Sequence, residues 1–216
     1  MAEFFKNFDY QPPSNYIKIT TIDMHTGGEP LRIPIAGIPK IEGNSVLEKR
    51  QFFKENYDHI RTGLMFEPRG HADMYGAIVT EPSTKDADFD VFFIHNEGYS
   101  TMCGHAILAL TKFVFETNLI PNKTTNKLTI NVPAGTVYAE AKMEHGVVVE
   151  SNFVNVPSYL HSRDQIVQVE GIGEVKFDIA FGGAYYAFVE AASVGLKMTP
   201  DYYNQLIDYG LSLIHI

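Results

Sequence analysis

The chain has 216 residues, of which 45% are hydrophobic and 20% charged, the composition of an ordinary globular protein long enough for one large domain or two small ones. A net charge of −9 argues against a nucleic-acid-binding surface and against binding to anionic membranes. The single cysteine, Cys103, cannot form an internal disulfide, and we see no secretory signal or membrane span, so we expect a reducing, cytoplasmic compartment.

Hydrophobic periodicity predicts an α+β chain in which most strands are antiparallel. Runs that alternate apolar and polar residues, or that are short and wholly apolar, are typical of strands. Ser45 and Glu48 have capping-box spacing before apolar residues at helical intervals, and Gly63 is expected to cap the end of that helix. In chain order we expect a loose leader at 1–15, strands at 16–23 and 31–35, the helix from Ser45 to Gly63, strands at 77–80 and 89–95, a turn at 96–100, a helix at 106–115, a meander at 127–132, 136–143 and 147–152, a hairpin at 165–169 and 174–180, a strand at 185–191, and a last helix starting at Thr199.

The most apolar part of the chain is a strand and a helix on either side of the cysteine. Phe89–His95 (FDVFFIH) is typical of a buried strand. Nearly every residue from Ala106 to Phe115 is apolar, so this helix should be covered on all sides at the centre of a domain. Cys103 therefore lies near the amino-terminal end of a buried helix.

Cys103 is the strongest candidate for a reactive group. Unpaired backbone N–H groups and the positive end of the helix dipole favour a thiolate at this place. Gly104 would let the backbone approach a ligand, and the N–H groups of Gly104 and His105 could hold a carboxylate. The His105 ring could add a charge or a hydrogen bond. The alternative is that Cys103 is a small buried hydrophobe.

We expect neither a cofactor nor a metal. The chain has no phosphate-binding loop and no CxxC pair, and its eight histidines lack the i, i+4 spacing of helical metal ligands. Gly171-Ile172-Gly173 is a weak dinucleotide signal because a strand is expected after it. His71 with Asp73, or His95 with Glu97, could join a metal site, but loop hydrogen bonding is the better interpretation.

Met102-Cys103-Gly104-His105 resembles the first catalytic motif of the proline racemase family. Two other stretches agree, Asp23–Ile33 (DMHTGGEPLRI) and Leu64–Ala77 (LMFEPRGHADMYGA), and His95–Leu110 (HNEGYSTMCGHAILAL) and Ile179–Val189 (IAFGGAYYAFV) complete the resemblance. Within the family they most resemble the trans-3-hydroxy-L-proline dehydratases.

The resemblance implies two similar α/β halves, each a curled, mostly antiparallel sheet around a central helix, with a cyclic imino acid bound between them. It implies that Cys103 removes the α-proton of trans-3-hydroxy-L-proline on the way to Δ1-pyrroline-2-carboxylate, and that Gly104 and His105 contact the substrate. The loops His25–Glu29 and Arg69–Asp73 either line the cleft or only satisfy backbone groups at tight turns. Family members are often homodimers.

Two alternatives remain open. A proline racemase or hydroxyproline 2-epimerase would share Cys103 but need a second thiol on the opposite face of the substrate. A ligand-binding relative without catalytic activity would keep the fold and have an ordinary thiol. The residue that distinguishes racemase from dehydratase lies in the family's second catalytic motif, which this sequence does not contain.

Family members continue past the last residue of this chain, so only one wall of the cleft is expected and the chain alone should be inactive. We predict a first domain at 16–191 and the start of a second at 192–210. Leu211–Ile216 (LSLIHI) reads like a translated adapter from a sequencing library and is expected to be a non-native tail. The alternative is the apolar end of the last helix.

Overall fold

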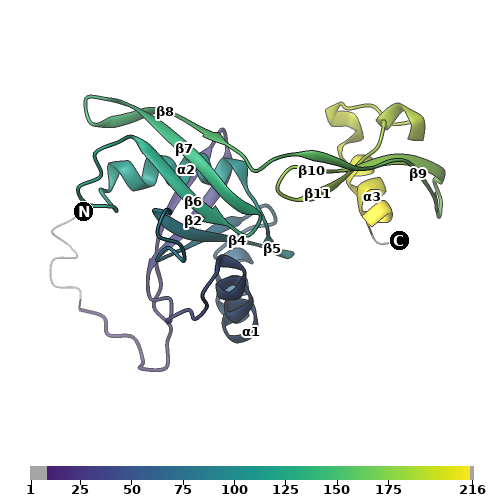
Figure 1. Ribbon diagram of the computed structural model, residues 1–216. Coiled ribbons are helices and arrows are strands. Elements are labelled where there is room, and N and C mark those ends of the chain that lie inside the picture. The colour runs from purple at the N-terminus through teal and green to yellow at the C-terminus, as the bar shows by residue number, and fades with distance from the viewer. Residues whose placement is uncertain (1–8, 215–216) are drawn as a thin grey trace.

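The computed structural model describes residues 9–214, which form two sheets linked by a single segment of chain (Figure 1). The first sheet has eight strands in the order β1-β2-β3-β4-β6-β7-β8, with β5 paired to β4, and the second has the order β11-β10-β9. The strands of the first sheet are β1 (Thr20–Thr26), β2 (Glu29–Ala36), β3 (Tyr75–Thr80), β4 (Phe89–His95), β5 (Gly98–Ser100), β6 (Lys127–Val132), β7 (Gly135–Glu144) and β8 (Val147–Val154). The remaining elements are the helices α1 (Val46–Met65), α2 (Gly104–Glu116) and α3 (Tyr203–Ile214), the strands β9 (Tyr159–Val169), β10 (Gly173–Phe181) and β11 (Tyr185–Phe188), and the 3-10 helices η1 (Ala191–Val194) and η2 (Pro200–Tyr202).

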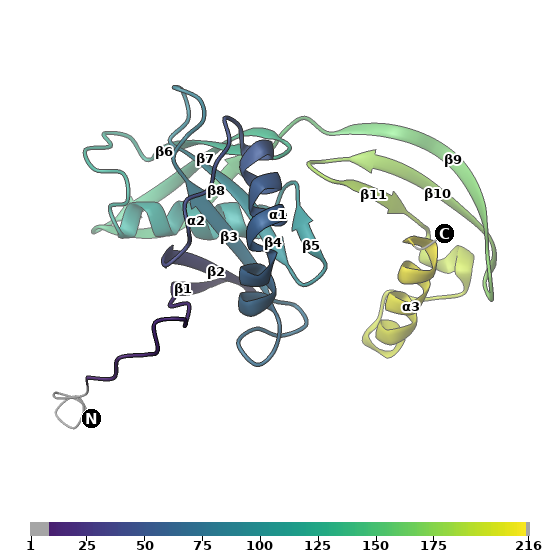
Figure 2. The same cartoon turned by 90° about the horizontal axis from the view of Figure 1, so that it is seen from below.

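The first sheet curls around α2. Its pairs are antiparallel except β2 with β3 and β4 with β6, which are parallel. The strands at its two ends, β1 and β8, both pack against α2, which is possible only because the sheet wraps around the helix (Figures 1 and 2). The predicted α+β half, a curled and mostly antiparallel sheet around a central helix, is confirmed.

Strand β4 lies between two helices, which explains its continuous apolar run. Successive side chains of a strand point to opposite faces. Accordingly Val91 and Phe93 belong to the core around α2, and Phe92 and Ile94 to the core under α1. All four side chains are completely buried. The predicted strand has the bounds that the structure shows.

The helix expected at 106–115 is α2, which begins two residues earlier and ends one residue later. Among its residues only Glu116 is exposed. The helix was expected to be covered on all sides, and this is confirmed except at Glu116. The three-stranded meander that follows it, β6 to β8, is also confirmed.

Helix α1 starts where its capping residues predict and ends later than Gly63. The Ser45 side chain accepts a hydrogen bond from the N–H of Glu48 at 3.2 Å. The helix continues to Met65, so the predicted glycine cap is wrong. Side chains from elsewhere satisfy its last carbonyls: Arg69 Nε donates to Gly63 O at 2.5 Å and Arg32 Nη1 to Leu64 O at 2.8 Å.

The first strand is displaced from the range predicted for it. β1 starts four residues after Tyr16 and continues through His25 and Thr26, which we expected in a turn. Gly27 and Gly28 alone form the turn, with φ of 62° and 107°, because both central residues of such a tight hairpin need positive φ. The turn predicted at 96–100 is likewise shorter, because Gly98–Ser100 is β5.

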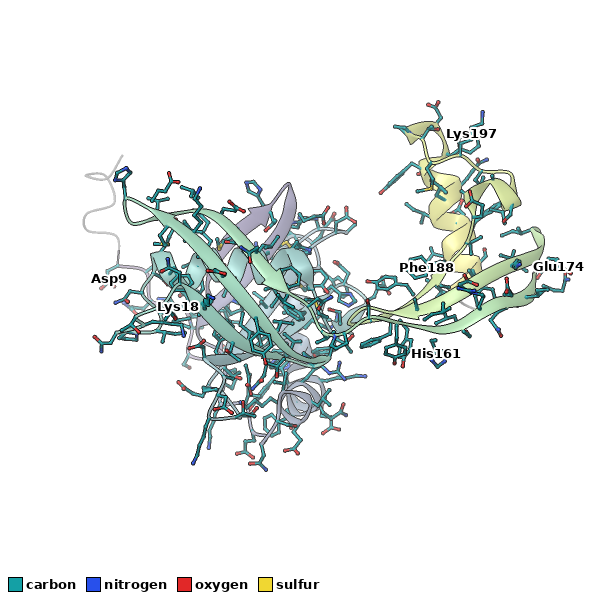
Figure 3. The ribbon with its side chains drawn as sticks, turned by 45° about the horizontal axis from the view of Figure 1, so that its top comes forward. Asp9, Lys18, His161, Glu174, Phe188 and Lys197 are labelled. Atoms are coloured by element: carbon teal, nitrogen blue, oxygen red, sulfur yellow. The ribbon has the colours of Figure 1, made fainter. Side chains whose placement is uncertain are left out.

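The hairpin predicted around Gly171–Gly173 is β9 and β10, and the strand predicted to start at Tyr185 is β11, which ends at Phe188. Figure 3 shows His161 on the nearer part of this second sheet and Glu174 at its far end. The chain passes from the first sheet to the second between Val154, the end of β8, and Tyr159, the start of β9.

The division into domains at residue 191 stays a prediction, as does the tail. Of the proposed non-native residues, Leu211–Ile214 lie in α3, and residues 215 and 216 lie outside the described part, as do residues 1–8 of the leader. Among residues 9–214, no helix is both long and apolar enough to cross a membrane.

Candidate active site

Cys103 is the N-cap residue of α2, in the link from β5 to the helix. Its backbone is extended, with φ −147° and ψ 109°, and its carbonyl accepts the N–H of Ile107 at 3.1 Å. The side chain is 7% exposed and borders the core around α2. β5 lies on the side of the first sheet that faces β10 and β11 (Figures 1 and 2), so α2 begins on the side toward the second sheet.

His105 connects Cys103 to the β1–β2 hairpin. Its Nδ1 lies 3.3 Å from Cys103 Sγ, and its Nε2 lies 3.3 Å from the carbonyl oxygen of Pro30. Thr26 Oγ1 donates to the carbonyl of His105 at 2.9 Å. The loop His25–Glu29 is therefore held against the start of α2. From the sequence it could either line the cleft or only satisfy backbone groups at a tight turn.

Three more side chains gather here, of which the sequence singled out only His95, as a possible metal ligand. The Tyr75 hydroxyl is hydrogen-bonded to Ser100 Oγ, and the Tyr75 ring stacks on His95 at 5.4 Å between ring centroids. The same ring meets His105 edge-on at 5.1 Å. These contacts follow from pairing, because β4 places His95 opposite both Tyr75 and Gly98. The sequence signal was that Tyr75 falls inside one family-like stretch, Leu64–Ala77, and that His95 and Ser100 fall inside another, His95–Leu110.

Burial raises the pKa of the Cys103 thiol from 9.0 to about 11. The N–H of Ala106, the Tyr75 hydroxyl and the N–H of His105 each act to lower this pKa, whereas the charge of Glu29 raises it further. The sulfur makes no regular capping hydrogen bond. The prediction that the helix end favours a thiolate is therefore wrong for this structure, because loss of water outweighs the N–H groups.

Gly104 has a packing role that the sequence did not indicate. A Cβ added there would lie 3.3 Å from Cζ of Phe153 on β8, closer than an ordinary contact. The glycine thus lets the edge strand approach the first turn of α2. The substrate contacts expected of Gly104 and His105 stay predictions.

The loop Arg69–Asp73 forms one hydrogen bond within itself and accepts another from β2. Arg32 Nη1 donates to the carbonyl of Arg69 at 2.6 Å, and the N–H of Asp73 donates to Nδ1 of His71 at 3.2 Å. Within residues 9–214, no group of three or more histidine, cysteine or acidic side chains is placed to hold a metal ion.

The second sheet is attached beside Cys103 through Gly182 and Gly183. Thr101 Oγ1 donates to the carbonyl of Gly183, and Asn155 Nδ2 donates to that of Gly182 at 2.8 Å. Gly183 has φ 108°, and a Cβ on it would lie 2.6 Å from Cβ of Met102. Both the conformation and the close approach need glycine.

Gly183→Ala is expected to lower the free energy of unfolding by about 2 kcal/mol or more, since it adds backbone strain to a steric clash. The measurement is chemical denaturation, with limited proteolysis of the 155–183 segment as a second readout. Gly182→Ala is the matched control, because a Cβ there meets nothing within 4 Å. Equal stability of the two variants would contradict the prediction.

Solved structures contain the same arrangement of a curled sheet around a central helix. The solved hydroxyproline epimerase of Agrobacterium vitis, with bound trans-4-hydroxy-L-proline, matches with a TM-score of 0.83 and 26% identity over 90% of this chain and 58% of the other. The family model described as proline racemase matches residues 21–216, so the chain belongs to the proline racemase family.

Among curated relatives, the trans-3-hydroxy-L-proline dehydratase of Colwellia psychrerythraea is 50% identical over 91% of this chain and 56% of its own length. The human trans-3-hydroxy-L-proline dehydratase is 44% identical over 88% of this chain and 55% of its own length. The chain thus spans little more than half the length of the relatives it matches.

Proposed function

We propose that this chain supplies the Cys103 half of an enzyme that dehydrates trans-3-hydroxy-L-proline to Δ1-pyrroline-2-carboxylate without a cofactor. The observation that carries the proposal is the 50% identity to a trans-3-hydroxy-L-proline dehydratase over nearly the whole chain. The position of Cys103 at the start of a buried helix supports it, because this is where a base and N–H donors for a carboxylate occur together.

In this mechanism the substrate completes the activation of the base. The amino acid's ring nitrogen carries a positive charge, which lowers the pKa of a thiol close to it. The backbone N–H groups of Gly104 and His105, at the first turn of α2, hold the carboxylate and draw off part of the charge that develops at the α-carbon. Cys103 then accepts the α-proton as a thiolate.

The stereochemistry of the substrate allows one residue to complete the reaction. In trans-3-hydroxy-L-proline the hydroxyl and the α-hydrogen lie on the same face of the ring. Cys103 takes the proton from the α-carbon, the C3–O bond breaks, and the proton leaves with the hydroxide as water. The remaining enamine tautomerises to the cyclic imine, so all atoms and electrons are accounted for.

Racemisation or 2-epimerisation is the second candidate, favoured by the similarity to the Agrobacterium vitis epimerase. Such a reaction needs a second acid on the opposite face of the substrate. In D₂O an epimerase would return substrate or its C2 epimer carrying deuterium at the α-carbon. A dehydratase would release the imine.

The test uses the 216-residue chain and a chimera in which residues 1–210 are followed by the remaining C-terminal part of the Colwellia psychrerythraea relative. We expect the chimera to form Δ1-pyrroline-2-carboxylate and the chain alone to form none. Exposed aromatic side chains on β11 support the second expectation, since Tyr185, Tyr186 and Phe188 are each more than half exposed. Epimerised product from the chimera would contradict the proposed dehydration. Turnover by the chain alone would contradict its expected inactivity.

A further inference from the structure

We propose that the Glu29 carboxylate binds the positively charged ring nitrogen of the substrate and so holds the α-carbon beside Cys103. This inference rests on the proposed function, because it takes a cyclic amino acid as the ligand. It deepens that function by naming the side chain that selects a cationic ring. Glu29 is the first residue of β2 and follows the Gly27-Gly28 turn directly.

The register of β2 places the Glu29 side chain on the face of the sheet that covers α2. Side chains of a strand alternate between the two faces, so Glu29 shares its face with Leu31 and Ile33. Both of these residues are buried in the core around α2. Glu29 is exposed, because it lies at the end of the strand. Its carboxylate therefore lies at the rim of the core around α2.

Contacts of the β1–β2 hairpin show which end of α2 the carboxylate lies beside. Thr26 is the cross-strand partner of Glu29, and the side chains of such a pair start roughly 5 Å apart on the same face. Thr26 Oγ1 donates to the carbonyl of His105, in the first turn of α2, at 2.9 Å. The carbonyl oxygen of Pro30, the residue after Glu29, lies 3.3 Å from Nε2 of the same histidine. Glu29 thus lies between two residues that contact the start of the helix.

The carboxylate has no partner that would compete with a ligand. Among the residues that the structure describes, Glu29 takes part in no side-chain hydrogen bond and no ion pair. Its negative charge acts on Cys103 and raises the pKa of the thiol. A cation bound to Glu29 would cancel that charge. Because the ring nitrogen of the substrate is bonded to the α-carbon, the same contact would bring the α-hydrogen to the sulfur.

The first test measures the charge beside Cys103, the only cysteine in the chain. Trimethylammonioethyl and sulfonatoethyl methanethiosulfonate carry opposite charges and both modify the thiolate, so the ratio of their rates does not depend on how much of the thiol is ionised. In Glu29→Gln we expect the ratio of cationic to anionic rate to fall about tenfold, because a neighbouring unit charge is lost. Glu29→Asp should keep most of the wild-type ratio. An unchanged ratio in Glu29→Gln would overturn the proposal.

Glu174→Gln is the matched control, because it removes the same charge at the far end of the second sheet (Figure 3). Its rate ratio should equal that of the wild type, and a fall as large as that of Glu29→Gln would attribute the effect to net charge and overturn the proposal. If thermal melting shows that Glu29→Gln does not fold, Glu29→Thr, a strand-forming residue opposite Thr26, decides by the same criterion.

The second test measures the ligand, in the Colwellia chimera. We expect trans-3-hydroxy-L-proline to protect Cys103 from both reagents, and Glu29→Gln to raise the concentration for half protection about tenfold. Tetrahydrofuran-2-carboxylate has an oxygen in place of the ring nitrogen, so its protection should not weaken in the variant. Equal loss with both ligands, or no loss with either, would overturn the proposal.

The two tests separate this proposal from the proposed function. Protection that depends on Glu29, without formation of the imine, would contradict dehydration and leave the role of Glu29 standing. Imine formation with the same protection in Glu29→Gln as in the unmodified chimera would do the reverse. If trans-3-hydroxy-L-proline did not protect the unmodified chimera, both proposals would be wrong.

Discussion

Cys103→Ala should lower the rate of dehydration of trans-3-hydroxy-L-proline by the Colwellia chimera about a hundred- to ten-thousandfold, the usual contribution of a positioned general base. The other base beside the sulfur is the His105 ring, whose Nδ1 lies 3.3 Å from Cys103 Sγ and whose Nε2 lies 3.3 Å from the carbonyl oxygen of Pro30. The measurement is the rate of imine formation together with release of the α-hydrogen.

Cys103→Ser gives the sharper comparison. Serine nearly preserves the shape of the side chain but has a far higher pKa, so it should lose activity to a similar degree while its melting temperature stays close to that of the unmodified chimera. Near-normal dehydration by either variant would remove Cys103 from the mechanism. Loss of substrate binding in both would instead indicate that the sulfur helps to form the carboxylate site.

The sequence predicted those elements whose residues carry the signal locally. β4 and α2 have mostly apolar runs, which are typical of a strand or helix buried on nearly all sides, and their positions are confirmed within two residues. The meander from β6 to β8 alternates at a period of two and has its turns at glycines. The position of Cys103 at the start of α2 was predicted correctly for the same reason, because it lies between β4 and α2, whose sequence patterns are clear.

What the sequence did not predict depends on contacts between distant residues. The end of α1 is set by Arg32 and Arg69, and no local pattern around Gly63 contains that information. Tyr75 and Ser100 meet only because both of their strands pair with β4. The ionisation of Cys103 was misjudged because the helix end is visible in the sequence, whereas the depth of burial is a property of the whole fold.

Lys49→Met should lower the free energy of unfolding at neutral pH by about 3–5 kcal/mol, the usual effect of removing one partner of a buried ion pair. Lys49 Nζ lies 2.8 Å from Asp90 Oδ2, and the Asp90 side chain is 1% exposed. Lys49 also donates to the carbonyl of Glu81 at 2.6 Å. The matched control is Lys176→Met, because Lys176 pairs with Asp164 at 2.6 Å on an exposed surface and should change stability by at most about 1 kcal/mol.

The pH dependence of stability tests whether the unpaired Asp90 carboxylate causes the destabilisation of Lys49→Met. Burial acts to raise the pKa of Asp90, but Lys49, Ser83 and Asn131 outweigh it and hold the pKa below 3.8, so the wild type loses this stabilisation as pH falls below that value. Without Lys49 the folded-state pKa should lie above 3.8, and the variant then loses stability as pH rises. The difference between the two proteins should therefore grow from about pH 3 to pH 7. Adding Asp90→Asn to Lys49→Met should recover part of the lost free energy of unfolding at pH 7. If the difference in stability between the wild type and Lys49→Met did not change with pH, lost packing and not the unpaired charge would be the cause.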